Sequence, residues 1–376
     1  MMKNKLAIIG ASIDQKPLAL KAKEMGIETW CFAWDKYEQD FLCKDFADHY
    51  IPISVLDKEK ILEECRKIQI DGVASIANDY CVPTVSFIAQ NMGFPGNRYE
   101  DSLIAINKLS QRQAFAKYGV NCPTFTHADD DVDLTGFTYP LIVKPVDRSG
   151  SVGVLSAENE DALRDAVAQA RQLSFSNSVI IEEYMTGCEA TVDLISWQGK
   201  HYAIAISDTE TTRAPYYTKI GYHQPSGLSP DIQEKIMDEA KKAITALKIN
   251  YGASDVEAMV TDKGEVKIIE VNARMGSDCT EILLKYSAGY DIIKAVINMA
   301  LNRFEEPVFP IKKYSGVCFL GKETEYLLPF FENKEKYPEI VLAEIVDNKL
   351  YELRCGADRS GYFIYQSEQR KKWNIS

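Results

Sequence analysis

Short apolar runs and amphipathic stretches alternate along the first hundred residues. Three apolar runs predict strands, at residues 6–9, 29–33 and 73–77. Between the second and the third run, four apolar residues share one face of a predicted helix, namely Ile61, Leu62, Cys65 and Ile68. Repeated strand–helix units of this kind predict a parallel sheet with helices on its faces, and such sheets bind ligands at the carboxyl ends of their strands.

The pattern changes after the turn-rich residues 93–97. A helix is predicted after Lys108, with Ser110 and Gln113 in a capping-box pattern and Gly119 as its stop. Strands then dominate, with predicted bounds of 141–144, 152–155, 179–184, 190–196, 202–206, 256–260 and 266–271. Later helices are predicted at 230–247, 278–288 and 291–302, and short strands and turns follow them.

These elements predict an α/β and α+β protein of several domains. A Rossmann-like domain is expected at residues 1–97, although residues 10–12 lack the G-x-G-x-x-G glycines, so a scaffold is favoured over a dinucleotide site. A second domain is expected at 98–304, with subdomains at about 98–185 and 186–304. Residues 305–376 are expected to form a small β-rich region.

Composition narrows the class of protein. The 376 residues carry 43 Lys and Arg against 55 Asp and Glu, a formal charge of −12, which argues against a nucleic-acid partner or an anionic membrane surface. No apolar run approaches the roughly 18 residues that span a bilayer. The nine cysteines are scattered without a C-x-x-C pair, as in a protein of a reducing compartment, so we expect a cytoplasmic location.

A lysine and a small, flexible loop follow one another at 144–154. Lys144 ends a predicted strand, and the loop after it carries Ser149, Gly150, Ser151 and Gly153. Small residues let backbone N–H groups approach a polyphosphate, to which a lysine adds a point charge. The alternative is an ordinary glycine-rich turn.

An apolar strand at 179–184 runs into a connecting segment and then an acid. Glu182, Glu183 and Met185 lie where a backbone C=O and N–H can pair with an adenine, and the carboxylate of Glu189 can accept hydrogen bonds from two ribose hydroxyls. A strand end with solvated acids is the alternative.

A third group lies on the strands predicted at 256–260 and 266–271, which Asp262-Lys263-Gly264 is predicted to join as a hairpin turn. Glu270 and Asn272 are two residues apart and so face the same side of a strand, and Glu257 can lie opposite them on the partner strand. Two carboxylates and an amide oxygen suit a hard cation such as Mg²⁺ or Mn²⁺. Arg274 continues the same face, where it can stabilise charge on a transferring phosphoryl group. A solvated sheet face is the alternative.

The order of these groups along the chain resembles the ATP-grasp superfamily over roughly residues 1–300. The resemblance implies a two-subdomain ATP-grasp fold after the Rossmann-like domain, with ATP between the subdomains. It implies that Lys108 and Lys144 contact the phosphates under the 149–153 loop. It further implies that Glu183 and Met185 read adenine, that Glu189 binds ribose, and that Mg²⁺ is held by Glu257, Glu270 and Asn272.

Two stretches are similar to L-amino-acid ligases, which are carboxylate–amine ligases. Residues 223–228 resemble that group's P-A-x-L segment with a departure at Ser226-Gly227, and residues 272–278 resemble N-x-R-x-G-G-D with Ser277 in place of a glycine. The resemblance implies an ADP-forming ligase that activates a carboxylate, most simply of an amino acid, as an acyl phosphate for an amine. A bicarbonate-activating carboxylase and a non-catalytic nucleotide-binding regulator stay open as alternatives.

Substrate contacts are less defined by the sequence. The loop 211–217 with Arg213 is a candidate for lining the acceptor pocket, and Asn78 and Asp79 can reach the cleft from a strand's carboxyl end. For each of them a surface position is the alternative. We expect small-molecule carboxylate and amine substrates, and a homodimer is compatible with these expectations.

Overall fold

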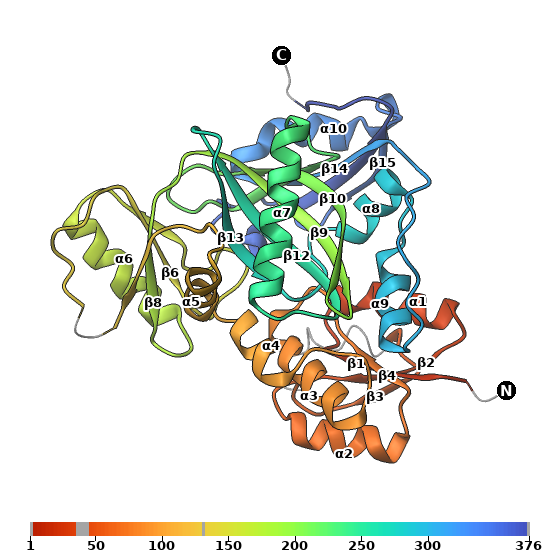
Figure 1. Cartoon of the computed structure of the whole chain (residues 1–376). Helices are drawn as coiled ribbons and strands as arrows, with labels where there is room; N and C mark the ends of the chain where they lie inside the picture. Colours follow the sequence, from red (N-terminus) through yellow and green to blue (C-terminus); the bar gives the residue numbers. More distant parts are fainter. Residues whose placement is uncertain (1–2, 35–44, 130–131, 374–376) are drawn as a thin grey trace.

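The computed structural model describes residues 3–34, 45–129 and 132–373. The strands in these ranges form three sheets, two of four strands and one of eight (Figure 1). None of the helices in the described ranges is long and apolar enough to cross a membrane.

The first sheet is parallel, in the order β3-β2-β1-β4. Its strands are β1 Lys5–Ile9, β2 Glu28–Phe32, β3 His49–Ile51 and β4 Gly72–Ala74. Its helices are α1 Lys16–Glu24, α2 Lys58–Ile68 and α3 Val82–Met92. Alternate residues of β1 enter two cores, because Leu6 and Ile8 pack with residues of α1, whereas Ala7 and Ile9 pack with residues of α2 and α3. The predicted Rossmann-like sheet is confirmed.

A later helix, α9 Ile292–Ala300, also packs on this sheet. The fit is close at Gly72, where an added Cβ would lie 2.6 Å from the carbonyl oxygen of Ala300. Ile195, Ala253 and Met275, which belong to the part of the chain that forms the large sheet, lie in the same buried cluster. The first sheet and the large sheet therefore share one core.

The second sheet forms a separate lobe, at the left of Figure 1. Its strand order is β5-β8-β6-β7. The elements are β5 Phe125–Ala128, β6 Leu141–Pro145, β7 Leu155–Ala157, α6 Glu160–Leu173 and β8 Val179–Glu183. Leu163, Ala166, Val167 and Ala170 of α6 pack on the sheet to give this small lobe a core of its own.

The large sheet has the order β13-β12-β9-β10-β11-β14-β16-β15. Its strands before residue 300 are β9 Gly187–Trp197, β10 Lys200–Thr211, β11 Lys219–Gln224, β12 Gly252–Thr261 and β13 Val266–Asn272. The helices around it include α4 Tyr99–Ala105, α5 Lys108–Tyr118, α7 Pro230–Ala246 and α8 Thr280–Ala288. The predicted hairpin is present as β12 and β13, whose turn contains Gly264 at a φ of 76°.

The C-terminal residues extend this large sheet. They contribute β14 Tyr314–Leu320, α10 Leu328–Glu332, β15 Ile340–Ile345 and β16 Gly361–Ser367. Antiparallel pairing of β11 with β14 makes the connection. The division into domains at residues 97 and 304 stays a prediction.

Two local predictions are wrong. The strand predicted at 152–155 begins only at Leu155, because Gly150, Ser151 and Gly153 have φ values of 67°, 62° and 76°, which an extended strand does not allow. The helix expected to be capped at Ser110 begins at Lys108, and its cap is Asn107, whose side-chain oxygen accepts a hydrogen bond from Ser110 N at 2.9 Å. Asparagine is among the best N-cap residues because its short side chain reaches these free N–H groups.

The cap makes a testable difference between two neighbouring polar residues. We expect Asn107→Ala to lower the free energy of unfolding by about 1 kcal/mol, because it leaves the first turn of α5 without its acceptor. Ser110→Ala, the matched control, removes no cap and is expected to change stability by only a few tenths, about the scale of helix propensity. Urea unfolding followed by circular dichroism measures both, and equal losses would contradict the assignment.

Candidate functional site

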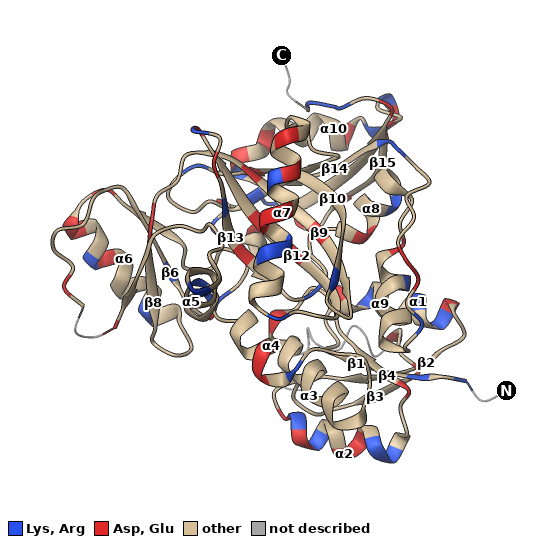
Figure 2. Ribbon diagram, in the orientation of Figure 1, with Lys and Arg blue, Asp and Glu red and all other residues tan. Residues whose placement is uncertain are grey.

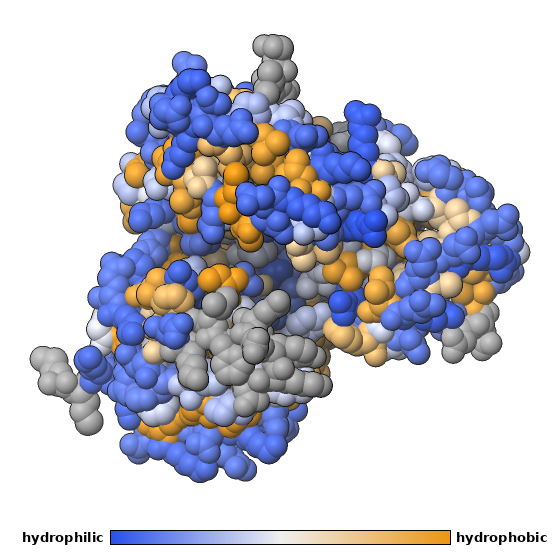
Figure 3. All heavy atoms as spheres, turned by 180° about the vertical axis from the view of Figure 1, so that it is seen from behind, coloured by the Kyte–Doolittle hydropathy of each residue, from blue (hydrophilic) through white to orange (hydrophobic). Residues whose placement is uncertain are grey.

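A cavity of about 1680 Å³ is lined by residues of the second sheet and the large sheet, and by residues such as Asp14 and Asp79 that follow strands of the first sheet. In the space-filling view of Figure 3 the surface is hollowed between the lower and upper parts of the molecule. Fifteen of the residues selected from sequence line it: Asp79, Lys108, Lys144, Ser149, Gly150, Ser151, Glu182, Glu183, Met185, Glu189, Arg213, Glu257, Glu270, Asn272 and Arg274. Residues up to 195 positions apart are thereby brought into one site.

Two selected residues lie outside the lining. Gly153 is packed beneath the loop, where an added Cβ would lie 2.9 Å from Cγ of Pro145 and 3.0 Å from Cδ1 of Leu173. The side chain of Asn78 accepts a hydrogen bond from Tyr80 N at 3.0 Å and caps a short 3-10 helix, Asp79–Cys81. Gly153 therefore allows close packing, and Asn78 caps a helix, without either residue lining the cavity.

Two buried lysines, Lys108 and Lys144, line the cavity. Lys108, the first residue of α5, donates to the carbonyl oxygen of Arg148 at 2.6 Å and to Glu270 Oε1 at 2.7 Å. Burial lowers the pKa of Lys108, but the charge of Glu270, the hydrogen bond to it and the charges of Asp79 and Glu257 together raise the pKa. The ammonium group is therefore kept charged inside the protein.

Lys144, on β6, depends on a buried carboxylate. Its Nζ lies 2.7 Å from Glu182 Oε2, and the other oxygen of Glu182 accepts from Nε of Arg112 at 2.7 Å. Burial raises the pKa of Glu182, but the charges of Arg112 and Lys144 outweigh it and the pKa is lowered. Glu182 thus holds Lys144 at the cavity.

The loop between β6 and β7 is tied down at its start. The carboxylate of Asp147 accepts hydrogen bonds from Ser174 Oγ at 2.9 Å, Phe175 N at 3.1 Å and Ser176 N at 2.8 Å. The guanidinium carbon of Arg148 lies 4.4 Å from the centre of the Phe175 ring. These bonds fix the base of the loop, while Gly150 and Ser151 lie at the cavity.

At the end of β8 the side chain of Glu183 is hydrogen-bonded to protein donors. Its Oε1 accepts from Thr124 N at 2.9 Å and from Lys267 Nζ at 2.5 Å. Because these donors occupy the carboxylate, a ligand in the cavity would meet the backbone of Glu183 rather than its side chain. Met185 follows in the irregular segment before β9 and also lines the cavity.

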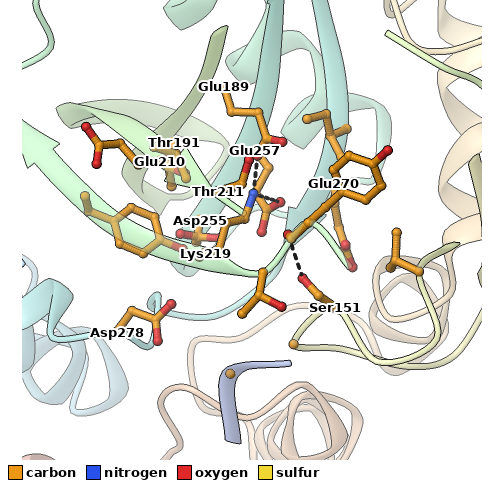
Figure 4. A pocket seen from close by; sticks show the side chains of 18 of the residues that line it. Ser151, Glu189, Thr191, Glu210, Thr211, Lys219, Asp255, Glu257, Glu270 and Asp278 are labelled. Atoms are coloured by element: carbon orange, nitrogen blue, oxygen red, sulfur yellow. Dashed lines mark hydrogen bonds and ion pairs between the residues drawn. The ribbon is translucent and has the colours of Figure 1, made fainter. Parts of the chain in front are cut away.

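Lys219 is a central residue that sequence reasoning missed. It begins β11 and ion-pairs with Glu189, and its Nζ lies 3.2 Å from Glu257 Oε2 (Figure 4). Burial lowers the pKa of Lys219, but the two carboxylates raise it well above its usual value. A lone lysine after a tyrosine-rich loop carries no local signal, so only the fold reveals its partners.

The proposed cation ligands lie in register on the hairpin. Glu257 of β12 is opposite Glu270 of β13, and Asp255 is opposite Asn272. The side-chain N–H of Asn272 donates to Asp255 Oδ1 at 2.9 Å, and burial together with the charge of Glu257 raises the pKa of Asp255 to about 6. Several oxygen ligands therefore lie close together, and the raised pKa of Asp255 means that its carboxylate is hard to ionise. Both features fit a site that binds a cation.

A cation at this point would be bound by the two carboxylates of Glu257 and Glu270 and the amide oxygen of Asn272. Within residues 3–34, 45–129 and 132–373, no group of three or more His, Cys, Asp or Glu side chains is arranged to hold a metal ion. Glu270 and Glu257 are paired with Lys108 and Lys219 in this structure. The donor chemistry therefore fits Mg²⁺ with phosphate or water oxygens completing its shell.

Arg274 joins the hairpin to the first sheet's domain. Its Nη2 lies 3.0 Å from Asp79 Oδ2 and its Nη1 lies 4.0 Å from Asp255 Oδ1, while its Nε is buried without a hydrogen-bond partner. Burial lowers the pKa of Arg274, but Asp79 and Asp255 raise it. A charged fork with a free donor at the cavity is suited to a carboxylate or a phosphoryl oxygen.

Comparison with known proteins gives a match to one family. Residues 137–282 match the model of the ATP-grasp domain. Over these residues the chain is similar to ATP-grasp domains. The resemblance drawn from the order of Lys108, Lys144, Glu257, Glu270 and Asn272 is thereby confirmed, and members of this family use ATP.

Relatives extend the likeness beyond the ATP-grasp domain. Carnosine synthase 1 of Homo sapiens is 23% identical over 326 residues, which cover 78% of this chain but 39% of that protein. A D-alanine–D-alanine ligase of Haemophilus influenzae is 26% identical over 218 residues, covering 54% of this chain and 72% of that protein. The chain thus spans well under half the length of carnosine synthase.

The fold as a whole is also matched. An L-amino acid ligase from Bacillus licheniformis superimposes with a TM-score of 0.82 and 19% identity, over 98% of this chain and 94% of that chain. The parallel sheet, the small lobe and the C-terminal strands are therefore part of the architecture in which this ATP-grasp domain is set.

The acidic net charge of the chain does not describe the charges inside the cavity. In the ribbon of Figure 2, acidic and basic residues lie close together along the helices α2 and α7. Inside the cavity, cations pair one by one with acids, as in Lys108 with Glu270 and Arg274 with Asp79. The charge that a ligand meets in the cavity depends on these local pairs rather than on the total of −12.

Glu182 offers a direct test of the buried charges. We expect Glu182→Gln to lower the free energy of unfolding by about 3–5 kcal/mol at neutral pH, because Lys144 and Arg112 lose their shared carboxylate. The pKa of Glu182 is lowered on folding, so its stabilisation is present above the unfolded pKa of about 4.3 and is lost as the pH falls through the folded pKa.

Urea unfolding of both proteins between pH 7 and pH 3 measures this difference, which should shrink towards the acid end. Glu160→Gln, the control, removes an exposed ion pair with Arg164 and is expected to cost less than about 1 kcal/mol. A Glu182 variant as stable as the wild type at pH 7 would show that the two ion pairs make no net contribution to the free energy of unfolding.

Proposed function

We propose that this protein is an ATP-dependent carboxylate–amine ligase that releases ADP and phosphate. The observation that carries the proposal is the single cavity where Lys108, Lys144 and the 149–153 loop face the acidic hairpin and Arg274. The relatives that form amide or peptide bonds, by their names, support the same reading.

ATP is proposed to lie along the cavity from the small lobe to the hairpin. Lys108 and Lys144 would bind its phosphates, with backbone N–H groups of Ser149, Gly150 and Ser151 above them. The adenine would pair with the C=O of Glu183 and the N–H of Met185. Glu182 acts through Lys144 rather than on the nucleotide.

Glu189 and Lys219 are proposed to change partners when the nucleotide binds. Ribose hydroxyls would donate to Glu189, which in this structure holds Lys219. The ammonium of Lys219, kept charged, would then be available to a phosphate oxygen. Mg²⁺, held by Glu257, Glu270 and Asn272, would supply charge neutralisation at the phosphates.

The proposed reaction has two steps. A substrate carboxylate oxygen forms a bond to the γ-phosphorus as the bond to the ADP oxygen breaks, giving an acyl phosphate. The amine nitrogen then bonds to the acyl carbon, phosphate leaves with its bridging oxygen, and the amine gives up a proton to solvent. Arg274 holds the carboxylate and stabilises developing charge, and the loop excludes water from the acyl phosphate.

The part of the cavity near Arg274 suits an amine acceptor. Asp14, Asp79 and Asp278 line the cavity together with Arg274. Asp79 and Asp278 are each paired with an arginine. Burial and the charge of Asp278 raise the pKa of Asp14, although a hydrogen bond from Ser12 lowers it. A carboxylate in such surroundings attracts an ammonium group. Arg213 and the 211–217 loop are proposed to contact the acceptor.

The domain boundaries at 97 and 304, a homodimer and a cytoplasmic location remain part of this proposal. The eight-stranded sheet that includes β14, β15 and β16 argues that residues 305–376 act together with the ATP-grasp domain.

ADP release against a panel of substrates tests the function. Purified protein with MgATP is given single L-amino acids, pairs of them, and separately bicarbonate, and ADP is measured in a coupled assay. We expect release that requires amino acids, with a product whose mass is the sum of two substrates less one water. Release that requires bicarbonate, or tight ATP binding with no release, would overturn the proposal.

Arg274 provides the test within the site. We expect Arg274→Lys to lower turnover at least tenfold and to leave ATP affinity unchanged, because a lysine cannot form the planar two-pronged contact with a carboxylate. Steady-state kinetics and calorimetric titration of ATP measure the two quantities. Arg66→Lys, an exposed replacement of the same kind on α2, is the control, and equal turnover in both variants would exclude the assigned role.

A further inference from the structure

The segment between β15 and β16 forms part of the cavity wall. Gly356, Ala357 and Arg359 line the cavity, although they lie more than 80 residues after the last element of the hairpin. Of the three, Arg359 has the side chain that connects this wall to other elements. Its side chain is 13% exposed.

Arg359 binds one residue with both ends of its fork. Its Nη1 pairs with Asp278 Oδ1, and its Nη2 donates to Asp278 Oδ2 at 3.2 Å. This two-pronged geometry with a carboxylate is specific to arginine. Burial raises the pKa of Asp278, but Arg359 outweighs burial and the pKa is lowered, so the pair stays ionised.

The same guanidinium binds the backbone of a second residue. Nε and Nη2 donate to the carbonyl oxygen of Lys219 at 3.2 and 2.9 Å. The guanidinium carbon lies 3.7 Å from the centre of the Phe319 ring on β14, which fixes the plane of the fork. One side chain therefore joins β14, the first residue of β11 and the loop after β13.

Both partners of Arg359 belong to the functional part of the cavity. Lys219 reaches from β11 to Glu189 and Glu257. Asp278, with a φ of 60°, ends the stretch that begins with Asn272 and Arg274. By binding both residues, Arg359 fixes the distance between Lys219 and Asp278. It thereby fixes the distance between the end of the cavity proposed for the phosphates and the end proposed for the acceptor.

We infer that Arg359 is a positioning residue through which the C-terminal strands hold Lys219 and Asp278 in their working places. The inference rests on the proposed ligase function and goes beyond it, because it gives residues 305–376 a part in the reaction. Arg359 acts on the reaction through these two residues, since its fork is occupied by protein groups.

Turnover of Arg359→Ala and Arg359→Lys tests the inference. We expect the alanine variant to lose at least tenfold in kcat with a smaller change in KM for the amino acids, because misplaced groups weaken the transition state more than binding. The lysine variant keeps the charge but loses the fork, and should recover only part of the loss. Arg354→Ala, an exposed arginine paired with Glu352 on the same segment, is the control and should keep wild-type kinetics.

Chemical rescue separates positioning from general destabilisation. Guanidinium ion at a concentration that leaves the wild type folded and active should restore turnover of Arg359→Ala, because it can occupy the vacated space between Asp278 and Phe319. It should not stimulate the Arg354 control. Asp278→Ala combined with Arg359→Ala should cost less than the sum of the two single losses.

A readout without turnover keeps this inference distinct from the proposed function. Hydrogen exchange of peptides covering 212–222 should be faster in Arg359→Ala than in wild type and Arg354→Ala, since the carbonyl of Lys219 loses two donors. If the wild type forms no amide, the ligase proposal fails while this exchange result still reports on the contact. Wild-type turnover in Arg359→Ala, or a loss that guanidinium does not restore and that adds fully to Asp278→Ala, would overturn the inference.

Discussion

Charges removed from water must be paired, and this requirement organises the centre of the molecule. Lys144 and Arg112 share Glu182, Lys108 pairs with Glu270, and Lys219 lies between two carboxylates. Through these pairs α5 is joined to β8 and β13, and residues that are distant in the chain meet at the cavity. In the proposed function a nucleotide and a cation would exchange partners within this set, so binding would rearrange existing ion pairs rather than create new buried charge.

The sequence predicted the elements that have a strong local pattern. The alternating apolar runs identified the parallel sheet, and Asp262-Lys263-Gly264 identified the hairpin that carries Glu257 and Glu270. Fifteen selected residues line one cavity, and they were selected from their order along the chain rather than from any one spacing. Periodicity failed at the 149–153 loop, where left-handed residues delay the start of β7, and at α5, where the cap is Asn107 rather than Ser110.

The missed residues share a physical reason. Lys219 and Arg359 owe their importance to partners that are distant in sequence, and neither of them stands in a glycine-rich or acidic motif. Asp278 ends the 272–278 stretch, but that stretch does not reveal its partner. An arginine 81 residues from its carboxylate is indistinguishable in sequence from a solvated arginine. Chemistry that depends on a local stretch can be read from the chain, whereas the supports of that chemistry become visible only after folding.

The close approach of Gly72 to Ala300 has a mechanical consequence. It belongs to a core that the parallel sheet shares with α9 and the large sheet, so these parts are joined as one body with little room to slide. The small lobe has a core of its own, and side-chain contacts such as Lys267 with Glu183 and Tyr80 Oη with the carbonyl oxygen of Asp147 join it to that body. If a nucleotide binds as proposed, we expect the lobe to move when the site opens, while the acceptor end of the cavity keeps its shape.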